Sequence, residues 1–175
     1  MHQSCTLLYL SLLVPLLSPG FVFGRLIAKY IDDEYGDLET GEKPEFKGGR
    51  WIRGGVCEGC APGVVPWHDN TRHTKDPIRS VAFNFTGISV EIFCILPNKH
   101  SDGVTVAYDI SFVLDGQLVG HFTHSPDPKA DFTYNKSVFS KDNLLPDTKH
   151  TMEVTLDSNT TDTVLLFDYA KYEIF

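Results

Sequence analysis

The sequence predicts an all-β protein, an antiparallel β-sandwich, on three observations. Apolar and polar residues alternate along several segments, most clearly Arg79–Thr86 and residues 104–114, as they do on strands with one buried face. Candidate strands recur roughly every 10–15 residues, with Gly, Pro, Asn and Asp between them. No segment after Tyr30 shows the 3.6-residue periodicity of an amphipathic helix.

The predicted strands follow one another through the second half of the chain. Arg79–Thr86 and residues 104–114 each place apolar side chains on one face. Residues 88–96 are almost continuously apolar, which is typical of a strand covered on both faces. Further strands are expected at residues 132–139, 150–156 and 163–172.

The Asp-Gly dipeptide that follows Leu114 predicts a hairpin turn. A two-residue loop would pair Leu114 with Gln117 and place this polar residue on the apolar face. A three-residue loop would pair Leu114 with Leu118 and Ile110 with Phe122, which keeps that face apolar. Because a one-residue slip reverses the two faces of a strand, we favour the three-residue loop.

Residues 1–24 have the pattern of a secretory signal peptide. They contain no Lys, Arg, Asp or Glu, and a Leu-rich centre is followed by small residues up to Gly24. We expect cleavage after Gly24, which leaves a secreted single β-sandwich domain, residues 25–175, without a membrane anchor. About 150 residues are enough for one domain with a sizeable core. The alternative is a retained anchor, because residues 5–24 come close to the ~20 residues that span a bilayer.

Removal of the leader leaves three cysteines. One Cys57-x-x-Cys60 pair cannot complete a tetrahedral zinc site by itself, and the glycines around it indicate a loop. We therefore expect a disulfide between Cys57 and Cys60 that pins this loop. Cys94 is expected to be a buried free thiol, and the alternative is a long-range disulfide to one loop cysteine. Residues 36–50 and 54–80 are expected to be long loops.

Three N-x-S/T sequons, at Asn84, Asn135 and Asn159, fit an oxidising, glycosylating compartment. Strand alternation places Asn84 and Asn135 on polar faces, and Asn159 lies in a polar stretch. Each can therefore carry a glycan without disturbing a core. Faces that carry such glycans are not expected to be partner interfaces.

Composition and motifs exclude several classes of function. The net charge is −8, the pI is near 5.2 and no basic stripe is present, which argues against nucleic acid and anionic membranes as partners. The chain has no G-x-S-x-G, no H-E-x-x-H and no phosphate-binding loop. We expect no enzyme activity and no cofactor. The alternative is a polysaccharide-active enzyme that uses two of the 23 acidic residues.

Seven short motifs, in this order and spacing, resemble a family of secreted fungal proteins. The motifs are Ile31-Asp32-Asp33, Gly49-Arg50-Trp51, Trp67-His68-Asp69, Phe85-Thr86-Gly87, Phe112-x-Leu114-Asp115-Gly116, Tyr134-Asn135 and Phe167-Asp168-Tyr169-Ala170-x-Tyr172. The resemblance covers residues 29–175 and implies a galactose-binding-domain-like jelly roll. The functions of this family are largely uncharacterised, so a carbohydrate ligand is implied by analogy with sugar-binding jelly rolls.

The segment Trp67-His68-Asp69 is the strongest local candidate for a ligand site. The indole of Trp67 could stack on a sugar ring while His68 and Asp69 bond its hydroxyl groups, and Trp51 is a second candidate aromatic. The alternative is that both tryptophans pack loops onto the sandwich while His68 and Asp69 bond backbone amides.

Metal sites have weaker support in the sequence. Asp32, Asp33 and Asp37 surround a glycine turn whose oxygen atoms would suit calcium, and the alternative is a solvated turn. His121 and His124 are three residues apart on an expected strand, so they face opposite ways.

The sequence therefore predicts a secreted, non-catalytic module that binds carbohydrate or cell wall, with cell-wall or host glycans as partners. The alternative is a protein-interaction or structural factor without affinity for sugar. An aromatic-lined cleft among the loop ends would favour the first, and an exposed apolar patch on one sheet would favour the second.

Overall fold

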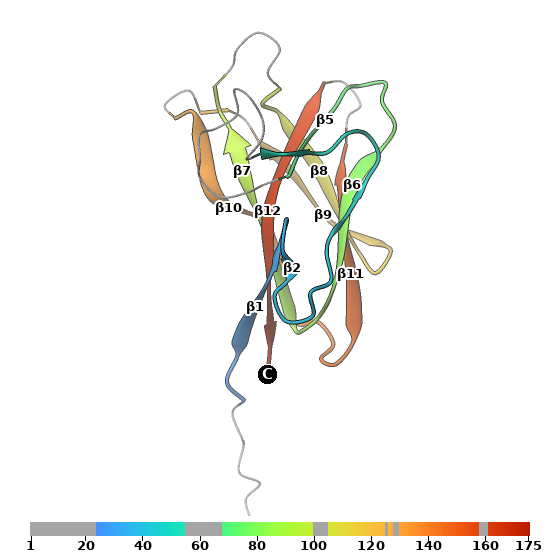
Figure 1. Cartoon of the computed structure of the whole chain (residues 1–175), viewed down its shortest axis with the longest axis vertical. Coiled ribbons are helices and arrows are strands. Elements are labelled where there is room, and N and C mark those ends of the chain that lie inside the picture. Colours follow the sequence, from blue (N-terminus) through green and yellow to red (C-terminus); the bar gives the residue numbers. More distant parts are fainter. Residues whose placement is uncertain (1–23, 55–67, 100–104, 125, 128–129, 158–160) are drawn as a thin grey trace, which may run out of the picture.

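The structure, a computed structural model, is a sandwich of two antiparallel sheets and describes residues 24–54, 68–99, 105–124, 126–127, 130–157 and 161–175 (Figure 1). These residues form strands and no helix, and accordingly none of their segments could cross a membrane as a helix. The strands are β1 (Ile27–Asp32), β2 (Gly36–Asp37), β3 (Glu45–Lys47), β4 (Ile52–Arg53), β5 (His68–Arg72), β6 (Arg79–Thr86), β7 (Ser89–Pro97), β8 (Tyr108–Leu114), β9 (Gln117–His124), β10 (Phe132–Lys141), β11 (Lys149–Leu156) and β12 (Thr163–Ile174).

The longest strand, β12, organises the seven-stranded sheet. One side of β12 pairs with β7, which pairs in turn with β10. On the other side, the first half of β12 pairs with β5 and the second half with β1. The short strands β4 and β2 extend the sheet beyond β5 and β1. The five-stranded sheet has the order β3-β6-β11-β8-β9.

The strands predicted in the second half of the chain are present. β6 has the predicted bounds, β7, β10, β11 and β12 differ from prediction by no more than two residues, and β8 begins at Tyr108 rather than at residue 104. The prediction of long loops is wrong in part, because residues 36–50 contain β2 and β3, and residues 54–80 contain β5. These polar segments have little strand propensity of their own. They become strands because longer strands accept them at a sheet edge.

The β8–β9 hairpin closes with two residues, so the prediction of a three-residue loop is wrong. Leu114 pairs with Gln117, and both turn residues have the positive φ that this tight turn requires. Ile110 nevertheless pairs with Phe122, as predicted, because the register shifts at a bulge within the hairpin. The bulge keeps Phe122 against the core while Leu118 stays 70% exposed.

The core between the sheets is largely apolar, and the hydroxyl group of Tyr108 links the two sheets inside it. Tyr108 of the five-stranded sheet is 1% exposed, and its hydroxyl donates to the carbonyl of Ile95 and accepts from the amide of Leu166, 2.8 Å away. Both partners belong to the seven-stranded sheet. Cys94 is a buried free thiol, as predicted, and burial raises its pKa.

Candidate functional site

Asp168 lies where β12 changes partners. The register between β12 and β7 shifts between Phe167 and Tyr169, so Asp168 occupies a β-bulge. On the opposite side of β12, the pairing with β5 ends at His68 and the pairing with β1 begins beside it. The amide of Asp33 donates to the carbonyl of Asp168 over 3.1 Å. Three polar residues far apart in the sequence, Asp33, His68 and Asp168, therefore meet at this junction.

Asp33 and His68 form a buried pair at the junction. Asp33 is 2% exposed, and its Oδ2 lies 2.5 Å from Nδ1 of His68. Burial raises the pKa of Asp33, and the contact with His68 opposes that rise. The imidazole also stacks on Phe46 of the five-stranded sheet, with 4.2 Å between ring centroids. His68 is therefore held in place by the carboxylate and by the opposite sheet.

Two further carboxylates lie on the strands that meet at this junction, the buried Asp168 on β12 and the partly buried Asp69 on β5. Burial, together with the charges of Asp33 and Asp32, raises the pKa of Asp168 to about 6. Burial alone raises the pKa of Asp69 to about 6. Oδ1 of Asp33 and Oδ1 of Asp69 are both buried without a hydrogen-bond partner. Within the described part of the chain, His68 is the one basic side chain that pairs with Asp33, Asp69 or Asp168.

The three aspartates of the calcium prediction do not converge on one point. Asp32 accepts hydrogen bonds from two amides of its own turn, at 2.9 and 2.8 Å. Asp37 accepts from amides of the next turn and from the hydroxyl of Tyr172, 3.0 Å away. Asp33 instead faces His68.

The structure brings two of the predicted ligand-binding residues, Trp51 and His68, together against the ring of Phe46. His68 and Asp69 lie in β5 rather than in a loop. Trp51 is half-buried against the core, with its ring centroid 5.0 Å from that of Phe46 and its Nε1 donating to the carbonyl of Lys47. This is the packing role that the alternative assigned to Trp51. Trp67, Cys57, Cys60 and Asn159 lie outside the described residues.

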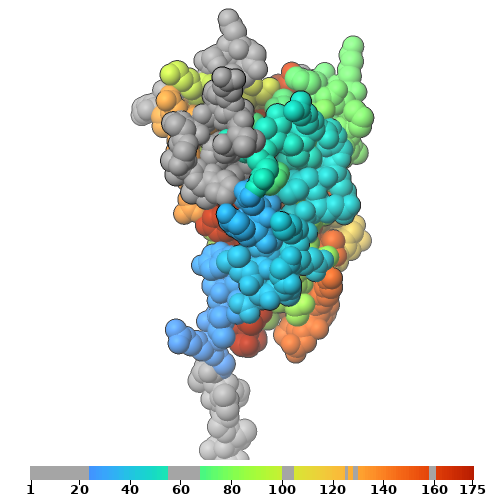
Figure 2. Space-filling model, viewed as in Figure 1, coloured from blue at the N-terminus to red at the C-terminus, as the bar shows by residue number. Residues whose placement is uncertain are grey.

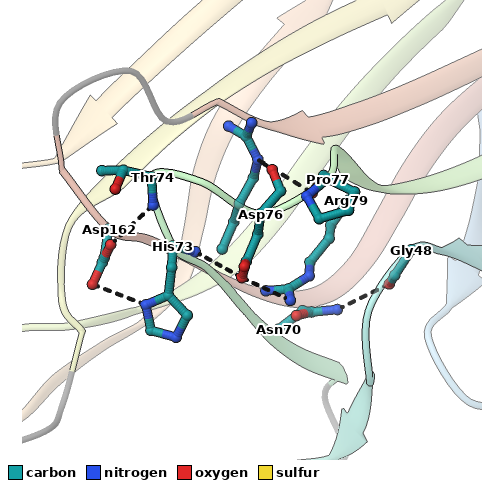
Figure 3. A network of polar contacts seen from close by, with 9 residues as sticks. Gly48, Asn70, His73, Thr74, Asp76, Pro77, Arg79 and Asp162 are labelled. Atoms are coloured by element: carbon teal, nitrogen blue, oxygen red, sulfur yellow. Dashed lines mark hydrogen bonds and ion pairs between the residues drawn. The ribbon is translucent and has the colours of Figure 1, made fainter.

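A polar network holds the turn between β5 and β6 (Figure 3). Oδ2 of Asp162 lies 2.9 Å from Nδ1 of His73, and Oδ1 of the same carboxylate accepts a hydrogen bond from the amide of Thr74. Asp76 pairs with Arg79 over 2.9 Å and accepts from the amide of His73. Asn70 donates to a backbone carbonyl of the β3–β4 turn. These side chains form hydrogen bonds and ion pairs with one another and with the backbone, so the network stabilises the turn. They do not point together toward a space where a ligand could bind.

A row of aromatic side chains crosses the outer face of the seven-stranded sheet. Tyr30 of β1 lies 6.0 Å from Tyr169 of β12, and Tyr169 lies 4.6 Å from Phe93 of β7 between ring centroids. Phe93 and Tyr169 stack in parallel, and Tyr30 is the most open ring at 42% exposure. Figure 2 shows red atoms of the β12 segment at the surface beside the blue atoms of β1. We call Tyr30, Tyr169 and Phe93 the aromatic row.

Polar groups surround the aromatic row. The hydroxyl of Tyr169 donates to Oδ1 of Asn135 over 2.5 Å. Lys171 pairs with Glu91 at 3.0 Å, and this contact raises the pKa of the ammonium group. Burial raises the pKa of the Tyr169 phenol, and Asp168 adds to the rise. The row is therefore an aromatic surface interleaved with hydrogen-bonding groups.

Sequence reasoning missed the aromatic row for a definite reason. Phe93 belongs to a run that looked covered on both faces, and Tyr30 and Tyr169 lie at opposite ends of the chain. Alternation would have placed Glu91 and Phe93 on one face, since Val90 and Ile92 are the buried residues beside them. That signal identifies one member of the row but not its neighbours.

The two described sequons lie on opposite sheets. Asn84 points away from the core, as predicted, and its Nδ2 donates to Glu42 over 2.6 Å while its Oδ1 accepts from Thr151. Asn135 has a positive φ, lies where the β10–β7 register shifts, and touches the aromatic row through Tyr169. A glycan on Asn135 would therefore start beside the row.

Comparison with known proteins identifies the fold. No protein-family model matches the chain, and no curated protein sequence matches it. Among solved structures, the chain is similar to a family 35 carbohydrate-binding module from Clostridium thermocellum, with a TM-score of 0.51, 10% identity and coverage of 85% of this chain and 97% of that one. The fold is a jelly-roll β-sandwich.

A second similar jelly roll is the CBM36-1 domain of a multidomain xylanase from the hindgut metagenome of Trinervitermes trinervoides. It has a TM-score of 0.42 and 12% identity, and the match covers 83% of this chain and 95% of that one. The two antiparallel sheets and the similarity to the family 35 module confirm the predicted fold class.

Proposed function

We propose that this jelly roll is a carbohydrate-binding module whose ligand lies on the aromatic row. The observation that carries the proposal is the continuous contact of Tyr30, Tyr169 and Phe93 across three neighbouring strands. The apolar faces of pyranose rings pack on aromatic side chains, and nearby polar groups bond the hydroxyls of the sugar. Tyr30 is the ring open for such packing.

The shape of the row favours an extended glycan over a single sugar. The row lies on the face of a sheet, where a chain of several sugars can follow neighbouring strands. Lys171, Glu91 and Asn135 supply charged and amide groups along its length. Cell-wall or host glycans of the extracellular space are the partners we propose, in keeping with the leader pattern and the sequons, and binding without catalysis is the proposed activity.

We expect Tyr30→Ala to weaken glycan binding by at least about tenfold, because it removes the exposed ring of the row. The measurement is a pull-down on insoluble glucan, chitin and mannan, followed by titration calorimetry with oligosaccharides of the polymer that is retained. Tyr35→Ala is the matched control, since Tyr35 is an exposed tyrosine in the β1–β2 turn. Equal losses in both variants, or no retention of the parent protein, would refute the proposal.

Glycosylation of Asn135 should oppose binding, because a glycan attached there begins beside Tyr169. Protein from a glycosylating host is expected to bind several-fold more weakly than its Asn135→Gln variant. Asn84→Gln is the control, since Asn84 lies on the other sheet. Mass spectrometry of the Asn135 peptide establishes its occupancy, and equal binding by fully occupied parent and Asn135→Gln would contradict this prediction.

The position of the row on a sheet face also supports a second function, attachment of a protein partner. An exposed aromatic patch is a common feature of protein interfaces. The ion pair between Lys171 and Glu91 and the side-chain amide of Asn135 lie beside the row. They make this surface more polar than the centre of a typical protein interface. Retention of the parent by none of the polymers, together with self-association that Tyr30→Ala abolishes, would favour this alternative.

A further inference from the structure

Two carboxylates and an imidazole meet on the outer face of the five-stranded sheet. One ligand atom each of Asp109, His121 and Asp157 lies within 4.8 Å of the other two. Nε2 of His121 is 2.6 Å from Oδ1 of Asp109. Among the described residues, no other group of three or more His, Cys, Asp or Glu side chains meets this distance criterion.

Strand register explains why the three side chains meet. Ser111 of β8 pairs with His121 of β9 on one side and with Thr155 of β11 on the other. Asp109 precedes Ser111 by two residues and Asp157 follows Thr155 by two, so all five point to the same face of the sheet. Adjacent strands lie about 4.8 Å apart, which is the spacing that the side chains need to converge. The amide of Asp157 also donates to the carbonyl of Asp109 over 2.7 Å.

The group lacks a fixed cation. In the described part of the chain, neither Asp109 nor Asp157 pairs with a lysine or arginine, and the one ion-pair partner of Asp109 is His121. Asp157 accepts a hydrogen bond from the hydroxyl of Ser111. Two carboxylates at this separation repel each other unless a positive charge lies between them.

We propose that Asp109, His121 and Asp157 bind one Zn²⁺ ion. Imidazole nitrogen with carboxylate oxygen is a ligand set that zinc accepts, and calcium and magnesium take oxygen ligands alone. Zinc would bind Nε2 of His121 in place of its contact with Asp109, in the neutral tautomer that carries the ring proton on Nδ1. Two carboxylates balance the charge of the ion, and water fills the fourth position.

Ser111 is a positioning residue in this site. Its hydroxyl bonds Asp157 and so orients the carboxylate toward the ion. The site lies on the sheet opposite the aromatic row, so it does not depend on the proposed glycan binding. It joins the edge strand β9 to β8 and to the end of β11, and zinc should therefore stabilise the fold.

Calorimetric titration of metal-free protein with zinc chloride at pH 7.5 tests the site. We expect one ion with a dissociation constant on the order of 10 μM, and a rise of roughly 5–10 °C in the unfolding midpoint at a hundredfold excess over that constant. His121→Ala should abolish both effects, and Ser111→Ala should weaken binding by about tenfold. X-ray absorption should show one imidazole, oxygen ligands and no sulfur, which separates this site from the cysteines.

His73→Ala is the matched control, because His73 also pairs with an exposed aspartate, Asp162, but belongs to no such group of three. It should bind zinc as the parent does. The proposal fails if His121→Ala keeps the parent affinity, if the parent binds no zinc at about 100 μM, or if calcium binds the same three residues more tightly than zinc. His121 is half-exposed, so its replacement should leave the fold intact, and Asp157→Asn provides a second variant.

Discussion

Replacement of Tyr108 by phenylalanine is expected to lower the free energy of unfolding by roughly 3 kcal/mol. The hydroxyl of Tyr108 donates to the carbonyl of Ile95 and accepts from the amide of Leu166. Phenylalanine fits the same space but leaves two backbone groups buried without a partner, each at a cost of about 1–3 kcal/mol. Because the two groups belong to β7 and β12, the loss should also loosen the contact between the sheets.

Urea denaturation followed by fluorescence measures this loss. Tyr134→Phe is the control, since Tyr134 is an exposed tyrosine of β10 and its variant should stay within about 0.5 kcal/mol of the parent. A Tyr108→Phe variant as stable as this control would show that the hydroxyl contributes nothing to joining the sheets. Hydrogen exchange provides a second measurement. The amide of Leu166 should lose protection from exchange in Tyr108→Phe but not in Tyr134→Phe.

Replacement of Asp69 by asparagine is expected to raise the free energy of unfolding by roughly 2–3 kcal/mol at pH 7.5 and to leave it nearly unchanged at pH 4. Burial raises the pKa of Asp69 from 3.8 to about 6 in the folded protein. Between these values the folded state keeps a proton that the unfolded chain has lost. Stability therefore falls as pH rises through this window, and the penalty is complete above pH 6.

Asparagine removes this penalty because a neutral amide is less costly to bury than a carboxylate whose Oδ1 has no partner. Denaturation of parent and variant at several pH values between 4 and 8 measures the effect. Asp142→Asn, at an exposed aspartate, is the control and should change stability little at any pH. Asp168 has a pKa raised to about 6 as well, so the variant should retain part of the pH dependence of the parent.

An Asp69→Asn variant that is less stable than the parent at pH 7.5 would contradict this prediction. The charge of the Asp69 carboxylate would then have to be neutralised in the parent, either by a bound cation or by a retained proton. Addition of calcium or zinc to the parent, with and without a chelator, then distinguishes the two explanations.

Local patterns predicted the strands well wherever one face of the strand is buried. Arg79–Thr86 alternates in sequence and is β6 in the structure, with Val81, Phe83 and Phe85 in the core. The hairpin after Leu114 shows the limit of such patterns. The alternation correctly paired Ile110 with Phe122, but a bulge rather than a longer turn produces that pairing.

The surroundings of the candidate site residues depended on neighbours that are distant in the chain. Trp51 looked like a possible sugar platform, and its contact with Phe46 across a turn makes it part of the packing. Asp33 looked like a member of a calcium turn, and its contact with His68 across the junction of β1 and β5 gives it a different partner. Neither partner follows from residue type or spacing.

The sequence by itself determined the long strands of the second half of the chain, the buried face of most of them and the buried thiol of Cys94, because these depend on a local two-residue period and on apolar runs. Only the tertiary structure decided which strands are neighbours. That choice brings Tyr30 beside Tyr169 and Phe93, and Asp109 beside His121 and Asp157. Backbone pairing sets these groupings, and the hydrogen bonds that pair strands are the same for every residue type except proline. The alternation of apolar and polar residues along one strand therefore does not indicate which strand lies next to it.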